Sequence, residues 1–457
     1  MYTDHMFRNE GEKSFLRNWS GSSCISGIAN LAWKMLQAVN RRLPEGELPS
    51  PKWAPGKMLK SYERSAPTLG FPRVTDSLCP RCVPEVRNAI IKGEMDISAL
   101  ISGQPGEIKA HIVEENGRVL MRKVCDKHGP FEDVLSTNSH FTRRIESLFL
   151  GRDFKCAEDK DVHRHGTSTI KFGRGAVLTV DLTNRCNMMC NPCFMDANQV
   201  GYVHQPSFED IKAILDRAVS FKPRRQVIVL FSGGEPTISP HFIEAVAYAK
   251  KIGFYRVMAA TNGIRFAQSE EFTRQAHEAG LHGAYLQFDG TSEEKNRHRG
   301  VGNLFDVKLQ AVENMAKAGM KTTLVTTIVN GVNNDGIGSI VEFAIRNIDK
   351  IQTIAFQPVS FTGRDEDIDD QTRYAHRYTL SQMVEDLKTQ LNADWEPLRD
   401  WFPLSSYSAF TSVMDLLQGD DAPWGWSACN CHPNCGIFTL LVVNRRTHEF
   451  APLAMWP

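Results

Sequence analysis

The chain has 457 residues, enough for about three domains or for one large domain with attachments. Its 53 lysines and arginines balance its 53 acidic residues, and no long run of like charge occurs, so we expect no nucleic-acid partner. With 42% hydrophobic and 23% charged residues, the composition is typical of a globular protein. No apolar run reaches the roughly 18 residues of a membrane span and no signal-peptide pattern opens the chain, so we expect a cytoplasmic protein.

Residues 1–70 are predicted to form a helical segment followed by a linker. An amphipathic helix is expected at about 24–41, and four prolines follow it between residues 44 and 55. The helix either packs on the rest of the molecule or uses Lys34, Arg41 and Arg42 to contact anionic headgroups at a membrane surface.

Residues 71–150 are predicted to form a small β-rich module. A hairpin is expected from strands near 108–113 and 118–124, joined at Asn116-Gly117. Two ligand pairs with knuckle spacing accompany it, because Cys79-Pro-Arg-Cys82 is followed by Cys125-Asp-Lys-His128. Three thiolates and an imidazole suit one tetrahedral zinc or iron ion. An additional cluster, or unligated buried cysteines, are the alternatives.

Residues 151–365 repeat a short apolar strand and a longer amphipathic helix. The alternation predicts an α/β fold with a parallel sheet, curled into a partial (β/α)6 barrel whose chemistry lies on the loops after the strands. The expected strands are 176–181, 227–231, 256–261, 284–289, 323–329 and 352–358. The expected helices are near 207–220, 240–252, 269–280, 304–318 and 337–348.

Three cysteines follow the first predicted barrel strand, at Cys186, Cys190 and Cys193. Three thiolates cannot complete the four-cysteine shell of a 4Fe-4S cluster, so one iron would stay open for a substrate or cofactor. A zinc site with a remote fourth ligand is the alternative. The thiols are clustered in a chain expected in a reducing compartment, which favours metal binding over disulfides.

With this loop and its neighbours, the sequence resembles the radical S-adenosylmethionine (SAM) superfamily over about 176–364. That family places C-x3-C-x2-C after its first barrel strand, a Gly-Gly-Glu-Pro motif after the second, and ribose contacts at later strand ends. The resemblance implies a 4Fe-4S cluster on the three catalytic cysteines, SAM as cofactor, and an electron donor such as ferredoxin or flavodoxin. The implied SAM-binding residues are Gly233, Gly234, Glu235, Thr261, Asn262, Gln287, Asp289 and Gln357.

Residues 366–457 are predicted to form a helical, cysteine-rich extension. Helices are expected near 379–391 and 406–418, and a final hairpin at 438–443 and 448–454. Its three cysteines again leave one ligand position open, which Cys156 is predicted to fill in an auxiliary 4Fe-4S cluster. Cys24, a substrate atom, or a structural zinc site are the alternatives. These three cysteines are Cys429, Cys431 and Cys435.

The flanking motifs resemble the tetraether (membrane-spanning) lipid synthase family over about 74–443. They are the metal-ribbon module, the Phe356-Gln357-Pro358 strand and the Cys431-His-Pro-Asn-Cys435 tail. The resemblance implies hydrogen abstraction from an unactivated lipid carbon, carbon–carbon coupling of two chains and contact with a membrane surface. This sequence departs from that family by keeping only Cys156 between ribbon and barrel.

Two other functions remain open. A different radical SAM activity, modification of a peptide or methylation of a pterin-like small molecule, fits every barrel motif. A zinc-binding interaction protein without catalysis is the alternative of another class, and it predicts zinc without sulfide and no SAM cleavage.

Overall fold

The computed structural model describes most of the chain between residues 69 and 455. The described residues are 69–101, 103–148, 177–199, 201–220, 228–361, 368–392, 394–407 and 434–455, together with Met35. Several predicted features lie outside them: most of the helix at 24–41, nearly all of the helix at 406–418, and Cys24, Cys156, Cys429 and Cys431.

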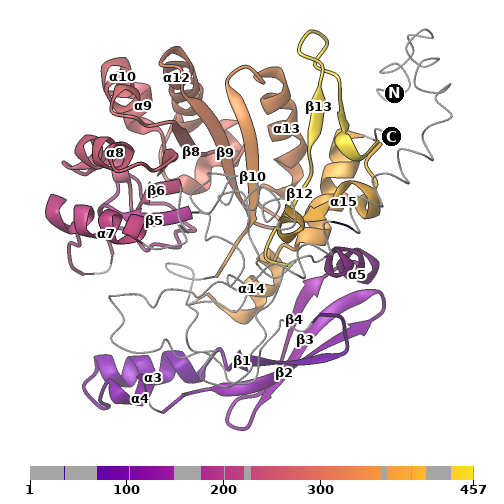
Figure 1. Cartoon of the computed structure of the whole chain (residues 1–457). Coiled ribbons are helices and arrows are strands. Elements are labelled where there is room, and N and C mark those ends of the chain that lie inside the picture. Colours follow the sequence, from indigo (N-terminus) through magenta and orange to yellow (C-terminus); the bar gives the residue numbers. More distant parts are fainter. Residues whose placement is uncertain are drawn as a thin grey trace, which may run out of the picture.

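A six-stranded parallel sheet forms the centre of the molecule, in the order β10-β9-β8-β7-β6-β5 (Figure 1). All six predicted strands are confirmed within a few residues, as is the partial barrel. Every neighbouring pair of strands is parallel, so the carboxyl ends of all six strands meet at one edge. The strands are β5 (Val177–Asp181), β6 (Ile228–Ser232), β7 (Arg256–Thr261), β8 (Gly283–Gln287), β9 (Lys321–Ile328) and β10 (Ile351–Pro358).

Helices cover the outer face of this sheet (Figure 1). Their apolar sides and the inward-facing strand residues form a buried core that includes Phe231, Val257 and Leu286. The helices and short 3₁₀ turns of this region are α7 (Phe208–Ser220), η1 (Pro236–Ile238), α8 (Phe242–Lys251), α9 (Ile264–Gln268), α10 (Glu270–Glu278), α11 (Glu293–Asn296), η2 (Arg297–Arg299), α12 (Leu304–Lys317), η3 (Asn334–Gly336) and α13 (Ile337–Arg346).

The N-terminal module is an antiparallel four-stranded sheet in chain order. The predicted hairpin is confirmed: Asn116 and Gly117 both have positive φ, at 50° and 74°, as a two-residue hairpin turn requires. Its elements are β1 (Arg73–Leu78), α3 (Cys82–Ile91), α4 (Ser98–Ile101), β2 (Glu107–Glu115), β3 (Arg118–Cys125) and β4 (Gly129–Ser136).

Helix α5 (Ser139–Ser147) follows this module but packs with C-terminal elements. Its Phe141 and Ile145 belong to a second core cluster with Val384 and Leu387 of α15. The other C-terminal elements are α14 (Asp370–His376), α15 (Leu380–Leu391), α16 (Pro397–Asp400), β11 (Phe402–Pro403), η5 (Leu404–Tyr407), β12 (Ile437–Phe438), β13 (Leu441–Val443), β14 (Phe450–Pro452) and η7 (Leu453–Met455).

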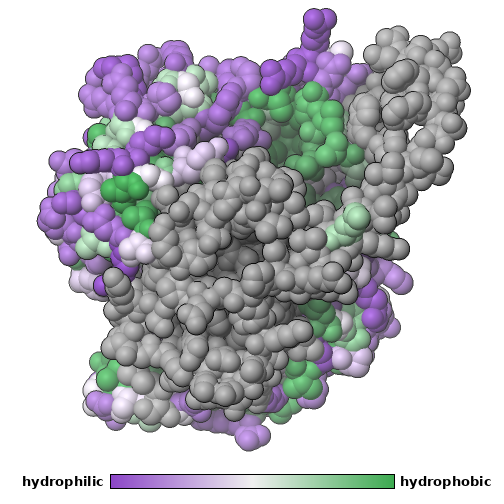
Figure 2. Space-filling view, viewed as in Figure 1, coloured by the Kyte–Doolittle hydropathy of each residue, from purple (hydrophilic) through white to green (hydrophobic). Residues whose placement is uncertain are grey.

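The surface is mostly hydrophilic over the barrel helices, while hydrophobic residues gather over α13 and β13 (Figure 2). Val442 of β13 is 40% exposed and the preceding Leu440 is 47% exposed. Within the described parts of the chain, no helix has the length and apolar character needed to cross a bilayer.

Candidate active site and metal site

The three-cysteine loop begins five residues after β5, at the carboxyl edge of the sheet. One side chain that sequence reasoning missed, Asn198, organises it. The Asn198 Oδ1 accepts a bond from the Cys186 backbone N–H (2.9 Å), and its Nδ2 donates to the Cys186 carbonyl (2.9 Å) and the Met188 carbonyl (3.3 Å). These bonds hold the loop in a defined shape around its first thiol.

Gly233 and Gly234 lie where the loop after β6 runs against the cysteine loop. The Gly234 N–H donates to the Thr183 carbonyl (2.7 Å), and the next N–H donates to the Arg185 carbonyl (2.9 Å). A Cβ on Gly234 would lie 2.2 Å from the Arg185 oxygen, and Gly233 has a φ of +120°. Both glycines are therefore required for backbone contact with the residues that lead into Cys186.

Glu235 connects the ends of β6 and β7. Its Oε1 accepts from the backbone N–H and hydroxyl of Thr237 and from the Thr261 hydroxyl (2.8 Å), while its Oε2 accepts from the Asn262 N–H (2.7 Å). Burial raises the pKa of this carboxyl, although these hydrogen bonds oppose the shift. Oε2 accepts one bond among the described residues, so it keeps capacity for a further donor such as an ammonium group.

Asn262 reaches from β7 to the cysteine loop. Its Nδ2 donates to the Asn187 Oδ1 (2.6 Å) and lies 3.9 Å from the Cys186 Sγ. Two of the predicted site residues, Glu235 and Asn262, are thus joined to each other and to the first thiol.

Asp289 has its carboxylate almost fully buried after β8. Its Oδ1 accepts from the Thr327 N–H (3.0 Å), and its Oδ2 accepts from Gln287, from His298 (3.2 Å) and from Nε of Arg299. Burial alone would raise the pKa of Asp289, but the Arg299 charge and the His298 bond outweigh it and hold that pKa well below its usual range. The carboxylate is therefore ionised and paired.

Arg299 joins this carboxylate to the cysteine loop. Its Nη1 donates to the Pro192 carbonyl (3.1 Å), and its guanidinium lies within hydrogen-bonding reach of the Cys190 thiol. Burial raises the pKa of Cys190, and the Arg299 charge partly offsets this rise. Nη2 of Arg299 is buried and has no hydrogen-bond partner among the described residues.

Lys308, on α12, is a fully buried lysine that bonds two of the residues at the strand ends. Its Nζ donates to the Asn262 carbonyl and to Oε1 of Gln287 (2.7 Å). Burial lowers the pKa of Lys308 to about 7. Sequence reasoning missed this lysine because a helical position gives no sign that the side chain points to the strand ends.

The site fits an iron-sulfur cluster on the evidence of its donors. None of Cys186, Cys190 and Cys193 is in a disulfide bond, so all three side chains are available as ligands, and the Arg299 guanidinium is a hydrogen-bond donor within reach of the Cys190 thiol. Such a donor suits thiolate or sulfide. When bound, a cluster of this kind supplies an electron that cleaves the sulfonium of SAM. Gln357 lies on the same edge, because it pairs with Thr327, which bonds Asp289.

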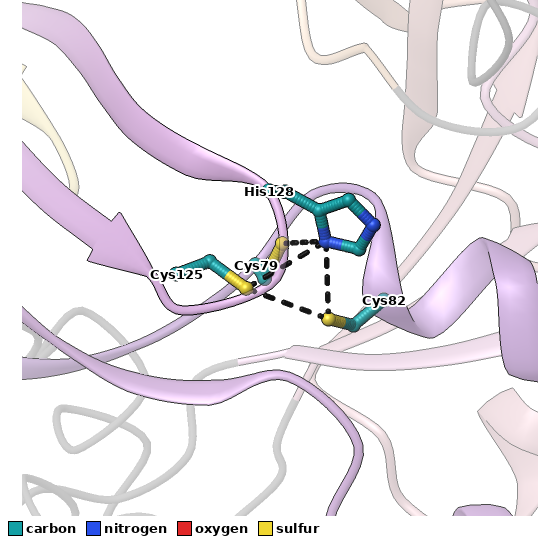
Figure 3. A group of neighbouring side chains, drawn as sticks. All are labelled: Cys79, Cys82, Cys125 and His128. Carbon is teal, nitrogen blue, oxygen red and sulfur yellow. Dashed lines mark hydrogen bonds between the residues drawn. The ribbon is translucent and has the colours of Figure 1, made fainter.

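The predicted ribbon ligands converge on one point (Figure 3). The His128 Nδ1 lies 3.4 Å from the Cys79 Sγ, 3.4 Å from the Cys82 Sγ and 3.6 Å from the Cys125 Sγ. The Cys82 and Cys125 sulfurs are 3.7 Å apart. A tetrahedral zinc with ordinary bond lengths separates two thiolates by about 3.8 Å and a thiolate from an imidazole by about 3.6 Å. The geometry therefore fits one mononuclear ion.

Two further residues support the ribbon site. Oε1 of Glu85 contacts the His128 Nε2 at 2.8 Å, which orients the ring with Nδ1 toward the thiols. Gly106 has a φ of +74°, and a Cβ on it would lie 2.7 Å from the Cys82 Cβ. Backbone N–H groups of His128 and Lys127, working against burial, lower the pKa of Cys125 to about 6, so this thiol is readily available as thiolate.

The predicted C-terminal site is represented in the described residues only by Cys435, whose side chain is exposed. Its neighbour Asn434 donates to the Glu146 Oε1 (2.9 Å), and Glu146 also pairs with Arg73 at 3.2 Å. The start of the ribbon, α5 and the C-terminal tail therefore meet at one buried carboxylate.

A cavity of about 530 Å³ lies beside β5, the edge strand of the barrel sheet. Asp181, His204 and Asp210 are among its lining residues. The His204 N–H donates to the Asn184 Oδ1 (2.9 Å), two residues before Cys186. The cavity wall is thus attached to the start of the cysteine loop, and its volume is in the range of small-molecule sites.

This arrangement defines an enzyme of the radical SAM class, and family comparison agrees. Residues 180–344 match the radical SAM superfamily model, and residues 71–137 match the HMPTM N-terminal zinc ribbon domain. The chain belongs to the radical SAM superfamily and is a 4Fe-4S-dependent enzyme that carries a zinc ribbon with a Cys3His site.

Similar proteins act on several kinds of molecule. The chain is 33% identical over 348 residues to 7,8-dihydro-6-hydroxymethylpterin dimethyltransferase of Methanocaldococcus jannaschii, covering 74% of this chain and 66% of that protein. It is 32% identical to Fe-coproporphyrin III synthase of Methanosarcina barkeri, over 48% of this chain and 54% of that one. The chain thus spans between about half and two thirds of these relatives. A crystal structure of methylornithine synthase aligns with a TM-score of 0.34 at 16% identity, covering 49% of this chain and 70% of that one.

These comparisons correct the expected lipid synthase relationship. The ribbon matches the HMPTM model, and the relative that aligns over three quarters of the chain is named for a pterin. The ribbon and tail motifs that suggested lipid coupling are short ligand patterns, which report metal binding and carry little information about the substrate.

Proposed function

We propose that this chain is a radical SAM methyltransferase that acts on a pterin-like small molecule. The observation that carries the proposal is the joint presence of a Cys3His ribbon of the HMPTM type and a radical SAM barrel in one chain. The 33% identity over 348 residues to a pterin dimethyltransferase supports the same substrate class.

The three barrel cysteines would hold the cluster, and the surrounding residues would bind SAM. Glu235 has a free acceptor position for the SAM ammonium group, and Asp289, held ionised by Arg299, lies among the residues expected at the ribose. Gly233, Gly234, Thr261, Asn262, Gln287 and Gln357 complete the proposed SAM site. Cys156, Cys429, Cys431 and Cys435 remain the proposed ligands of an auxiliary cluster, with ferredoxin or flavodoxin as the proposed electron donor.

The cavity beside β5 supports a small and partly polar substrate. Its volume is compatible with a bicyclic ring system, and the acceptors of Asp181 and Asp210 could bind the ring N–H groups of a pterin.

The test is a methylation assay with the anaerobically reconstituted full chain, SAM, a low-potential reductant and 7,8-dihydro-6-hydroxymethylpterin. Mass spectrometry should detect a pterin that has gained one or two methyl groups. The Cys186→Ala variant should form neither methylated pterin nor 5′-deoxyadenosine.

Two results would redirect the proposal. Formation of 5′-deoxyadenosine without methylated pterin would keep the radical chemistry and reject the substrate. If coupled lipid chains form in a host that expresses the parent chain, and do not form in a host that expresses Cys186→Ala, the lipid synthase hypothesis would be restored.

A further inference from the structure

Arg299 is placed between a buried carboxylate and the candidate cluster loop. It is only 6% exposed, its Nε bonds Asp289, and its Nη1 donates to the Pro192 carbonyl at 3.1 Å. Two of the three guanidinium nitrogens, Nε and Nη1, thus have partners that fix the position of the group. Its third nitrogen, Nη2, is buried and unpartnered among the described residues.

A buried guanidinium N–H without a partner is costly and calls for an explanation. The bonds of Nε to Asp289 and of Nη1 to the Pro192 carbonyl restrict the side chain, so it cannot easily turn away to find a partner. The thiol of Cys190 lies within hydrogen-bonding reach of the same guanidinium. In the cluster-loaded enzyme, the thiolate of Cys190 or a sulfide next to it would be an acceptor within reach of this guanidinium.

We propose that Arg299 is a positioning residue that raises the reduction potential of the radical SAM cluster by placing a positive charge and a hydrogen-bond donor against Cys190. The inference rests on the radical SAM assignment of this site and is independent of the substrate. Asp289 would hold the guanidinium in place.

The direction of the effect follows from charge. Reduction adds one electron to the cluster, taken from a one-electron donor of the ferredoxin or flavodoxin class that is oxidised in exchange, and no bond is made or broken in that step. A nearby cation and a donor to sulfur both stabilise the more negative, reduced state. Removing Arg299 also leaves the Asp289 carboxylate uncompensated, which disfavours reduction further.

The experiment is a redox titration of the anaerobically reconstituted full chain, followed by electron paramagnetic resonance of the reduced cluster. Arg299→Met should lower the equilibrium constant for one-electron reduction at least tenfold, which is a fall of about 59 mV in potential. Arg299→Lys keeps the charge and should show a smaller fall. Arg297→Met, an exposed arginine of the same short turn η2, is the matched control and should match the parent.

A second measurement distinguishes a lower reduction potential from a misfolded cluster site. With Arg299→Met, SAM cleavage should be slowed with a weak reductant and largely recovered with a stronger one such as titanium(III) citrate, which a misfolded site would not show. If Arg299→Met does not fold, the reduction potential of Arg299→Lys tests the inference, and a potential equal to that of the parent would contradict it.

The outcomes are distinct. Parent potentials in both Arg299 variants, at full iron and sulfide content, would overturn the inference and leave the enzyme class intact. Failure of the parent chain itself to take up a cluster on Cys186, Cys190 and Cys193 would overturn both.

Discussion

Lys308 has no exposed surface, and a charge in such a position is expensive unless it is well bonded. Its Nζ reaches the Asn262 carbonyl and Gln287, so it holds the ends of β7 and β8 together beneath the site. Gln287 also donates to Asp289, Asp289 pairs with Arg299, and Arg299 donates to the Pro192 carbonyl in the cysteine loop. Residues from three strand ends thus form one buried polar network.

The stability of the fold should depend on pH through Lys308. Its pKa of about 7 in the folded state is below the roughly 10.4 of an exposed lysine, so between these values the unfolded state binds the extra proton. The free energy of unfolding should therefore rise as pH increases from about 7 toward 10. Between about pH 7 and pH 9, the free energy of unfolding of Lys308→Met should rise by about 2 kcal/mol less than that of the parent.

Denaturant unfolding of the cluster-free chain at these two pH values checks this. Lys317→Met, a change at an exposed lysine of the same helix, should retain the parent's pH dependence. If the free energy of unfolding changes equally with pH in the parent and in Lys308→Met, Lys308 keeps an ordinary pKa.

Gly234 gives a second prediction at the scale of one residue. Gly234→Ala places a methyl group 2.2 Å from the Arg185 oxygen and should destabilise the fold by about 1–3 kcal/mol while lowering iron content. Gly302→Ala is the control, because a Cβ there meets nothing within 4 Å. Thermal unfolding and iron analysis of both variants make the comparison, and equal behaviour would contradict the close contact of the two loops.

At the scale of elements, the ribbon shows how a short sheet acquires a rigid metal site. Cys79 follows β1, Cys82 begins α3, Cys125 ends β3 and His128 precedes β4, so four element ends meet at the candidate metal site. The four strands bury little apolar surface, with Phe71, Ile112 and Val119 forming the small cluster beneath. We expect the metal to contribute much of the stability of this module.

Glu85 should strengthen that metal site through His128. Glu85→Gln weakens the acceptor that orients the imidazole, so zinc affinity should fall about 10–100-fold. Competition with a chromogenic chelator measures the change. Glu94→Gln, at an exposed carboxylate after α3, should bind zinc like the parent, and unchanged affinity in Glu85→Gln would exclude the orienting role.

At the scale of the whole molecule, α5 attaches the ribbon to the rest of the chain. Phe141 is 4% exposed in a cluster with Val341 of α13 and Val384 of α15. The Ser381 hydroxyl accepts the Thr137 N–H at 2.9 Å, and Arg377 pairs with Asp133 at 3.0 Å. These contacts make the ribbon part of one body with the barrel, as Figure 1 shows for α5 and α15.

Phe141→Ala should weaken this attachment by about 3–5 kcal/mol. The ribbon should still bind zinc, because its ligands lie elsewhere, but limited proteolysis should cut the chain faster near α5. Val124→Ala, at a side chain that is 63% exposed, should change neither property. Wild-type protease resistance of Phe141→Ala would show that the hydrogen bonds and ion pairs alone hold the ribbon.

Much of this protein was determined by local sequence. The alternation of apolar strands and amphipathic helices predicted all six barrel strands, and the Asn116-Gly117 turn predicted the first hairpin, because both patterns depend only on near neighbours. Ligand spacing likewise identified the ribbon site and the three-cysteine loop. Short motifs suggested a lipid substrate, which the comparisons do not support, since metal-ligand spacing says nothing about what enters the site.

Tertiary structure alone decided how these motifs are held. Arg299 and Pro192 are 107 residues apart, and Lys308 and Asn262 are 46 apart, so no periodicity relates them. They meet because parallel pairing brings every strand's carboxyl end to one edge, where buried polar groups must find partners within the protein. The sequence was enough to identify the three cysteines, and the folded sheet determined which charged residues surround them.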